Sequence, residues 1–156
     1  LGEQIPQMTA RMNRRAVELG LASLTFTNST GDDFKELEQA STGSAEDIAR
    51  MTWYAYERYP TLMRMTTQPS VQMRFANGRE MTIINTNEVA AQLPELRFSK
   101  TGYTDLAGGN LAVIIEPIED HPYVIVLMGS GFKGRFADMT TFARVIDETL
   151  STLDEA

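Results

Sequence analysis

Apolar residues recur at helical spacing near the start of the chain. The segment covers about residues 6–19 and is followed by Gly20, a residue type that commonly ends helices. Its apolar face consists of Met8, Met12, Ala16 and Leu19. This spacing predicts a short amphipathic helix.

Two further helices are predicted later in the chain. Ser44 matches a helix N-cap with the acidic Asp47 three positions on, and Pro60 is expected to end that helix. Its expected inward residues are Ile48, Met51, Ala55 and Tyr59. A single apolar stripe predicts a long C-terminal helix. The stripe consists of Met139, Phe142, Ile146, Leu150 and Leu153.

Strands are predicted in the middle of the chain. Apolar and polar side chains alternate on both sides of Asn77-Gly78, a pattern typical of a hairpin with a type I′ turn. Further extended segments are expected at 24–27, 62–67, 111–116 and 123–128. Helices combined with antiparallel strands indicate an α+β fold, with an antiparallel β-sheet flanked by helices.

The composition narrows the function classes. The 156 residues suit one domain, and a net charge of −7 argues against a nucleic-acid partner. The absence of cysteine excludes disulfides, thiolate catalysis and cysteine-ligated zinc. The single histidine, His121, adjoins Pro122 and is expected to be a loop residue, so a His-based metal site is not expected. No apolar run is long enough for a membrane span, and no metal or organic cofactor is expected.

The candidate chemistry lies at residues 100–102, Lys-Thr-Gly. The tripeptide alone is weak evidence, because it arises by chance in roughly one in ten chains of this length. Its context is more specific. Thr104 lies two positions after the glycine, and Ala-Gly at 107–108 leads into the next predicted strand.

Residues 98–111 resemble the Lys-Thr-Gly region of the low-molecular-mass penicillin-binding proteins, the D-alanyl-D-alanine carboxypeptidases of peptidase family S11. Further segments resemble the same family. They are residues 12–28, Ser41-Thr42, Asn85-Thr86-Asn87, residues 123–129 and Phe132-Lys133-Gly134-Arg135. The resemblance implies a β-lactamase/transpeptidase-like fold, of which residues 1–156 would be the C-terminal part of a single catalytic domain.

The resemblance implies a role for each residue of the motif. Lys100 would supply positive potential and help to relay protons, and Thr101 would offer its hydroxyl to the substrate carboxylate. Gly102 would leave room for the substrate backbone along an edge strand. The backbone N–H of Tyr103 would be one of two oxyanion-hole donors. The nucleophile would be a serine that is acylated by the substrate and then released by hydrolysis.

Two further residues are candidates for substrate binding. Arg135 matches the arginine of the family's Lys-Gly-Arg loop and could grip the terminal carboxylate of the substrate with its planar guanidinium. Alternatively, it is an ordinary charge in the first turn of a helix. Thr104 is the second candidate, and the alternative for it is a role in forming a turn. The Gly108-Gly109 pair is expected to allow close strand packing.

The chain departs from the family pattern because it lacks the S-x-N motif and a nucleophile. Ser130 and Lys133 have S-x-x-K spacing, but they follow the Lys-Thr-Gly motif, and Gly131 and Gly134 disfavour the helical turn that this motif needs. The nucleophile is therefore expected in an N-terminal half of the same domain. An apolar surface should be exposed where that half would pack.

The expected function of the whole protein is that of a serine-type D-Ala-D-Ala carboxypeptidase that trims peptidoglycan stem peptides, with the chain alone inactive. The expected partners are stem peptides ending in D-Ala-D-Ala, β-lactam antibiotics and the N-terminal half of the domain, in an extracytoplasmic location such as the periplasm or cell envelope. One alternative is a non-catalytic homologue that binds peptidoglycan peptides or β-lactams. Another is a β-lactamase-like hydrolase, which is disfavoured because the resemblance extends beyond the shared Lys-Thr-Gly.

Overall fold

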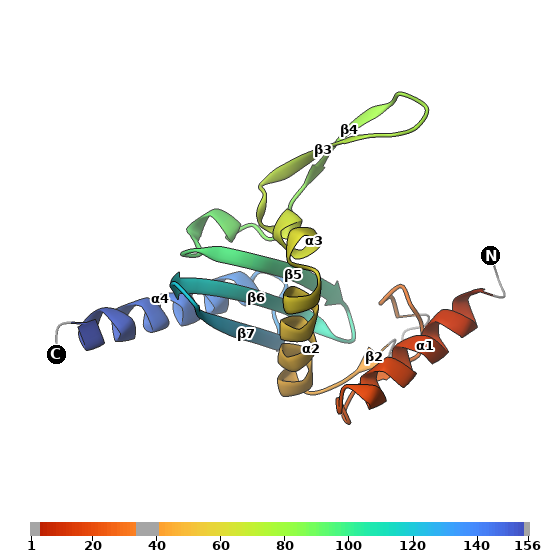
Figure 1. Ribbon diagram of the computed structural model, residues 1–156, viewed down its shortest axis with the longest axis horizontal. Helices are drawn as coiled ribbons and strands as arrows, with labels where there is room; N and C mark the ends of the chain where they lie inside the picture. The colour runs from red at the N-terminus through yellow and green to blue at the C-terminus, as the bar shows by residue number, and fades with distance from the viewer. Residues whose placement is uncertain (1–3, 34–40, 155–156) are drawn as a thin grey trace.

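Three antiparallel strands form the central sheet of the molecule (Figure 1). The computed structural model describes residues 4–33 and 41–154. The helices are α1 (Gln4–Glu18), α2 (Ala45–Arg58), α3 (Pro60–Arg64) and α4 (Gly134–Asp154), with short 3₁₀ turns η1 (Met65–Thr67) and η2 (Ala90–Gln92). The strands are β1 (Thr25–Phe26), β2 (Ser41–Thr42), β3 (Ser70–Arg74), β4 (Glu80–Ile84), β5 (Leu96–Thr104), β6 (Gly108–Ile118) and β7 (His121–Ser130). They form a β1–β2 pair, a β3–β4 hairpin and a sheet of order β5–β6–β7, so the α+β prediction is confirmed.

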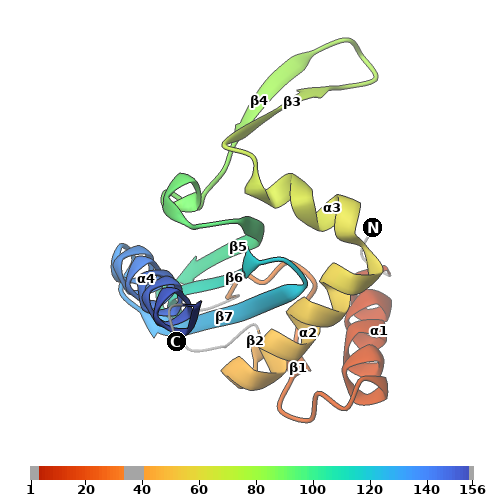
Figure 2. The same ribbon diagram turned by 60° about the vertical axis from the view of Figure 1, so that its left-hand side comes forward.

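Helices α4 and α2 cover opposite faces of the β5–β6–β7 sheet (Figure 2). Alternate residues of a strand point to opposite faces. Leu111, Val113 and Ile115 of β6 accordingly pack in one cluster with α4, while Ile114 points to the other face and is also fully buried. Strand β6 therefore contributes to packing on both sides, which is typical of a strand with a continuous apolar run.

The buried side of α4 follows the predicted stripe only in part. It consists of Phe136, Met139 and Ala143, with Ile146 packed beside them. Phe142 was predicted to be inward but is 51% exposed. It lies about 60° around the helix from Met139, on the side away from Phe136 and Ala143. The side chain of Leu153 lies outside the described residues.

Helix α1 confirms the first predicted helix, but its apolar face is shorter than expected. Ala16 is buried in a second small cluster with Leu21 and Leu24, against which Ile48 and Met51 of α2 pack. Met8, predicted on the same face, is 47% exposed. It lies two turns before Ala16, beyond the reach of this cluster.

Helix α2 begins at the predicted cap. The Ser44 hydroxyl accepts a hydrogen bond from the N–H of Asp47 at 3.1 Å. The Asp47 carboxylate in turn accepts hydrogen bonds from Ser23, at 2.8 Å from its N–H and 2.6 Å from its hydroxyl. These two bonds lower the pKa of Asp47 below its ordinary value. They also tie the first turn of α2 to the segment that follows α1.

The strand predicted at 62–67 is wrong, because this segment forms α3 and the turn η1. Pro60 ends α2, as expected, but it also occupies the first turn of α3, where a missing N–H costs no hydrogen bond. The residue before a proline is disfavoured in helical conformation. Tyr59 accordingly takes φ −134° between the two helices, and at 54% exposure it is not the inward residue that was predicted.

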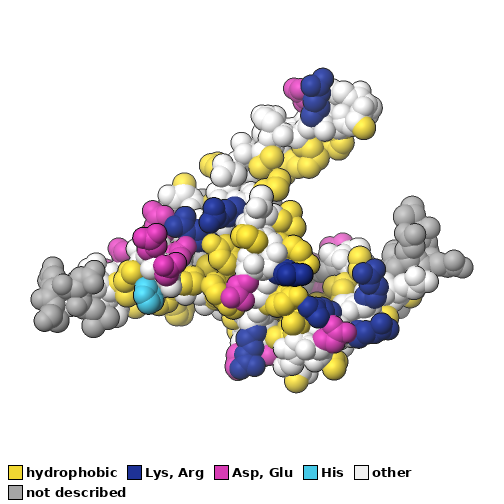
Figure 3. Space-filling view, viewed as in Figure 1, with side chains coloured by type: hydrophobic (Ala, Val, Ile, Leu, Met, Phe, Trp, Pro, Cys, Tyr) yellow, Lys and Arg dark blue, Asp and Glu magenta, His cyan; other side chains and the backbone are white. Residues whose placement is uncertain are grey.

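Strands β3 and β4 form the predicted hairpin, which projects from the rest of the molecule (Figure 1). Its turn is not type I′, since Gly78 has φ +81° but Asn77 has no positive φ. The N–H of Gly78 donates to Phe75 O at 2.9 Å, and that of Phe75 to Arg79 O at 2.8 Å. This is a three-residue loop, in which a type I turn precedes a left-handed glycine. Hydrophobic side chains gather along one side of the hairpin (Figure 3).

Strands β6 and β7 extend beyond their predicted ends. His121 is the first residue of β7, opposite Ile118, rather than a loop residue, although it is exposed. The intervening turn contains Asp120 in the left-handed region, with φ +63°.

Candidate active site

The Lys-Thr-Gly segment lies on β5, an edge strand of the sheet. Ser99 donates its backbone N–H to the hydroxyl of Thr66, outside the sheet, at 2.9 Å. Backbone N–H and C=O groups alternate between the two edges of a strand, and the β5–β6 register is regular from Phe98 onward. The backbone groups of Thr101 and Tyr103 therefore point to the same open edge as those of Ser99.

Two hollows meet at the motif, and both are lined by Lys100 and Thr101. The smaller, of about 260 Å³, lies between β5, the base of the β3–β4 hairpin and the loop at 85–86. The larger, of about 480 Å³, lies between α2 and the sheet and is mainly apolar, and Gly102 also lines it. Lys100 is exposed, and its ammonium donates to the carbonyl of Thr101. The strand thus presents a cation and a hydroxyl beside an open backbone edge.

Among the described residues, no neighbour leaves so little space that position 102 must be glycine. A Cβ built there would meet only the Asn110 Cβ, at 3.8 Å, which is ordinary van der Waals contact. The Gly108-Gly109 pair is different. A Cβ on Gly109 would lie 2.3 Å from Gly131 O, and Gly108 has φ +66°. The predicted close packing at this pair is confirmed, whereas Gly102 leaves space on the side of the larger hollow.

Thr101 is 9% exposed, and its hydroxyl lies 2.6 Å from the hydroxyl of Thr86. Thr86 belongs to Asn85-Thr86-Asn87, a segment that resembles the family but for which the resemblance implied no role. Hydroxyl pairing between distant residues has no local sequence signal, so only the folded structure shows the contact. The two asparagines that flank Thr86 are the sequence feature that could have drawn attention to this residue.

Arg135 is buried at the start of α4. Its guanidinium donates to the carbonyl of Gly102 and lies between the rings of Phe132 and Phe136, 5.0 and 4.7 Å from their centroids. Its buried Nε has no hydrogen-bond partner within residues 4–33 and 41–154. The ring of Tyr103 packs edge-on against Phe132, with centroids 4.9 Å apart. Arg135 therefore touches the motif strand itself, and it is not an exposed surface charge.

The remaining candidates are Thr104 and the pair Ser130 and Lys133. The hydroxyl of Thr104 accepts from the N–H of Ala107 at 3.0 Å, which supports the turn alternative for this residue. Ser130 donates to Asp138 at 2.7 Å, and the Lys133 ammonium lies 2.6 Å from a Glu88 oxygen. Ser130 and Lys133 thus have other partners, and the structure confirms that they do not form a serine–lysine pair.

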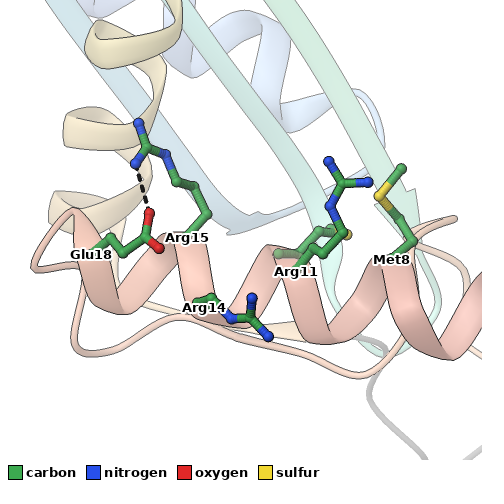
Figure 4. Close-up of a pocket in the computed structure, with 6 residues that line it drawn as sticks. Met8, Arg11, Arg14, Arg15 and Glu18 are labelled. Carbon is green, nitrogen blue, oxygen red and sulfur yellow. Dashed lines mark hydrogen bonds and ion pairs between the residues drawn. The ribbon is translucent and has the colours of Figure 1, made fainter.

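A further hollow, of about 390 Å³, follows the surface of α1 and contains no residue of the Lys-Thr-Gly segment. Figure 4 shows Arg11 and Arg15 on one side of the helix and Arg14 on another. Arg15 is paired with Glu18 at 2.7 Å, and this hydrogen bond is the main reason that the pKa of Arg15 is raised. The hollow is lined by charged residues and methionines of α1 and is separate from the candidate site.

No helix in the described ranges is long and apolar enough to cross a membrane. Residues 4–33 and 41–154 likewise contain no group of three or more His, Asp or Glu side chains arranged to hold a metal ion.

Comparison with known proteins agrees with the geometry. The family model for D-alanyl-D-alanine carboxypeptidases, Peptidase S11, matches residues 5–131. The chain is 28% identical over 134 residues to the D-alanyl-D-alanine carboxypeptidase DacF of Bacillus subtilis (strain 168), an alignment that covers 86% of this chain and 33% of that protein.

Solved structures show the same fold. Penicillin-binding protein D2 of Listeria monocytogenes, in its cefotaxime-bound form, superposes with a TM-score of 0.75 at 23% identity, covering 88% of this chain and 53% of that one. The D-alanyl-D-alanine carboxypeptidase of Mycobacterium tuberculosis H37Rv superposes with a TM-score of 0.69 at 24% identity, covering 89% of this chain and 54% of that one. The chain thus spans a third of the curated relative and about half of each of these structures. It belongs to the Peptidase S11 family of D-alanyl-D-alanine carboxypeptidases.

Proposed function

We propose that the complete protein is a serine-type D-alanyl-D-alanine carboxypeptidase and that this chain forms one side of its active site. The observation that carries the proposal is the position of Lys-Thr-Gly on the free edge of β5, with the backbone groups of Thr101 and Tyr103 directed outward. A peptide lying along this edge would gain strand-like hydrogen bonds. Family membership supplies the reaction class.

In the proposed reaction, a serine hydroxyl attacks the carbonyl carbon of the penultimate D-Ala. The bond to the terminal D-Ala nitrogen breaks, the serine proton passes to that nitrogen, and free D-Ala leaves. Water then hydrolyses the ester and regenerates the serine. The N–H of Tyr103 donates to the developing oxyanion, Lys100 supplies positive potential, and Thr101 binds the terminal carboxylate. Arg135 donates to the carbonyl of Gly102 and therefore lies at the part of β5 where Thr101 would bind the carboxylate.

We propose that the nucleophile belongs to an N-terminal part of the same domain. The chain spans about half of its structural relatives. Its larger hollow has an apolar lining that includes Met51, Met63 and Val126. Large apolar side chains also lie exposed on α3 and β4, where Leu62 is 63% and Ile84 74% exposed. Further protein packed on this side would cover such surfaces.

The proposed ligands are peptidoglycan stem peptides ending in D-Ala-D-Ala and β-lactams, in an extracytoplasmic compartment. Structures of Listeria monocytogenes penicillin-binding protein D2 in cefotaxime-bound and ampicillin-bound forms support the second class. The family supports the first.

A fluorescent penicillin tests this function on the complete gene product. Covalent labelling is expected, together with release of D-Ala from an acyl-D-Ala-D-Ala peptide. Lys100→Ala should abolish most labelling, whereas Ser130→Ala should retain it, because Ser130 is engaged with Asp138. Absence of both labelling and D-Ala release from the wild-type protein would reject the proposal.

A binding protein that does not cleave is the second candidate. Within this chain the S-x-x-K spacing at Ser130 and Lys133 supplies no nucleophile, because both side chains are engaged elsewhere. The two candidates therefore differ in whether the N-terminal part carries one. Saturable binding of an acyl-D-Ala-D-Ala peptide, without release of D-Ala, would establish this candidate instead.

A further inference from the structure

The hydroxyls of Thr86 and Thr101 form a contact that joins two separate parts of the chain. Their oxygens are 2.6 Å apart, within the usual range for an O–H···O hydrogen bond. Both residues line the smaller hollow, which Lys100 also lines. Thr86 thus belongs to the surroundings of the motif, although no role in the reaction has been assigned to it above.

The backbone around Thr86 is fixed by its two asparagine neighbours. The Asn85 amide donates to the carbonyls of Thr66 and Gln68, at 2.7 and 3.0 Å. The buried Asn87 donates to the Ser99 hydroxyl at 3.1 Å. These bonds attach the loop to η1 and to β5 on both sides of Thr86. The Thr86 side chain is therefore held toward Thr101 by bonds that do not involve its own hydroxyl.

Proton counting decides what this pair can do. Each hydroxyl has one proton to donate, so the contact uses the proton of either Thr86 or Thr101. A carboxylate only accepts hydrogen bonds. If Thr101 binds a carboxylate, its proton must point to the ligand, and Thr86 must then donate to the Thr101 oxygen. The result is a chain from Thr86 through Thr101 to the anion, in which each bond strengthens the next.

We infer that Thr86 is a positioning residue that directs the Thr101 hydroxyl toward the terminal carboxylate of the substrate. This inference rests on the proposed function. It concerns recognition of the carboxylate, since within the described part of the chain the Thr86 hydroxyl bonds Thr101 and not the backbone of Tyr103. Loss of the Thr86 hydroxyl should therefore lower the kcat/KM of substrates with a C-terminal carboxylate more than that of neutral substrates.

The test uses the complete gene product and two ester substrates of the same acyl-D-Ala group. One ends in D-lactate with a free carboxylate, and the other ends in the methyl ester of that carboxylate. Thr86→Val should lower kcat/KM about tenfold for the carboxylate substrate, as expected for loss of a hydrogen bond that supports an anion. The neutral substrate should change less than about twofold. Thr86→Ser should restore the preference for the carboxylate.

Thr82→Val is the matched control, because it removes an exposed hydroxyl of β4 that donates to the side chain of Gln72 at 3.1 Å, outside the Lys-Thr-Gly segment. It should leave both substrates unchanged. An equal fall for both substrates in Thr86→Val, or no fall, overturns the inference while leaving the proposed function intact, and so does failure of Thr86→Ser to restore the preference. A wild-type protein that neither turns over either ester nor reacts with penicillin rejects the proposed function, and the inference falls with it.

Discussion

The two faces of the β5–β6–β7 sheet differ in how completely they are covered. On the α4 face, Val113, Ile115 and Met139 have no exposed surface. On the α2 face, a hollow of about 480 Å³ remains between the helix and the sheet, with Met51 and Val126 in its lining. Both faces are formed by the same alternating strands.

The difference shows that apolar strands alone do not make a closed core. The apolar stripe of α4 runs along the sheet, and β6 packs against this stripe. Helix α2 contacts β7 and β6 but is held at its first turn by polar bonds to Ser23. The α4 face is therefore closed, whereas a hollow remains on the α2 face. In the proposed function, further protein would cover the α2 face and ligand would bind along the β5 edge.

The largest expected effect comes from matched methionine truncations on the two faces. In the chain of residues 1–156, Met139→Ala should reduce the free energy of unfolding by about 2–5 kcal/mol, because it leaves a cavity in closed packing. Met51→Ala should cost less, about 1 kcal/mol, because Met51 is only partly buried: it packs against the small cluster around Leu21 but also borders an open hollow. Urea unfolding of both variants measures the difference.

The same pair in the complete gene product sharpens the comparison. If further protein covers the α2 face, the loss caused by Met51→Ala should rise toward that of Met139→Ala. Equal losses already in the chain of residues 1–156 would show that the α2 face is a finished core.

An intermediate effect is expected from two glycines. Gly109→Ala should lower stability by about 1–3 kcal/mol, because its Cβ would lie 2.3 Å from a backbone oxygen. Gly102→Ala should leave the melting temperature unchanged, since its Cβ has space. It should nevertheless slow penicillin acylation about 10- to 100-fold, by displacing the ligand from the strand edge. Unchanged acylation in Gly102→Ala would contradict a ligand-binding role for this edge.

The smallest effect concerns the polar attachment of α2. Because the pKa of Asp47 is lowered in the folded protein, its carboxylate stabilises the fold above its ordinary pKa, and this contribution is lost as the pH falls through the lower folded value. Asp47→Asn should therefore be less stable than wild type at pH 7, and the difference should shrink in acid. Thermal unfolding between pH 2 and pH 7 measures it, on the order of a few degrees or less. A difference independent of pH would indicate that charge plays no part.

Local patterns predicted most of the elements but not their details. The cap at Ser44, the β3–β4 hairpin and the runs in β6 and β7 were recognised because each depends on neighbouring residues. The strand predicted at 62–67 was wrong because a short apolar run fits a strand or a helix equally well. The turn at Asn77-Gly78 differed because two loop geometries both place a glycine at positive φ.

The family resemblance, the α+β class and the Lys-Thr-Gly segment could be recognised in the amino-acid sequence, because they depend on residue identity and spacing along the chain. The packing of the folded chain was needed to show that Arg135 is buried against Gly102, that Thr86 contacts Thr101 and that one sheet face is closed while the other borders a hollow. These features join residues far apart in the chain. Their geometry depends on how whole elements pack, a quantity that no local pattern contains.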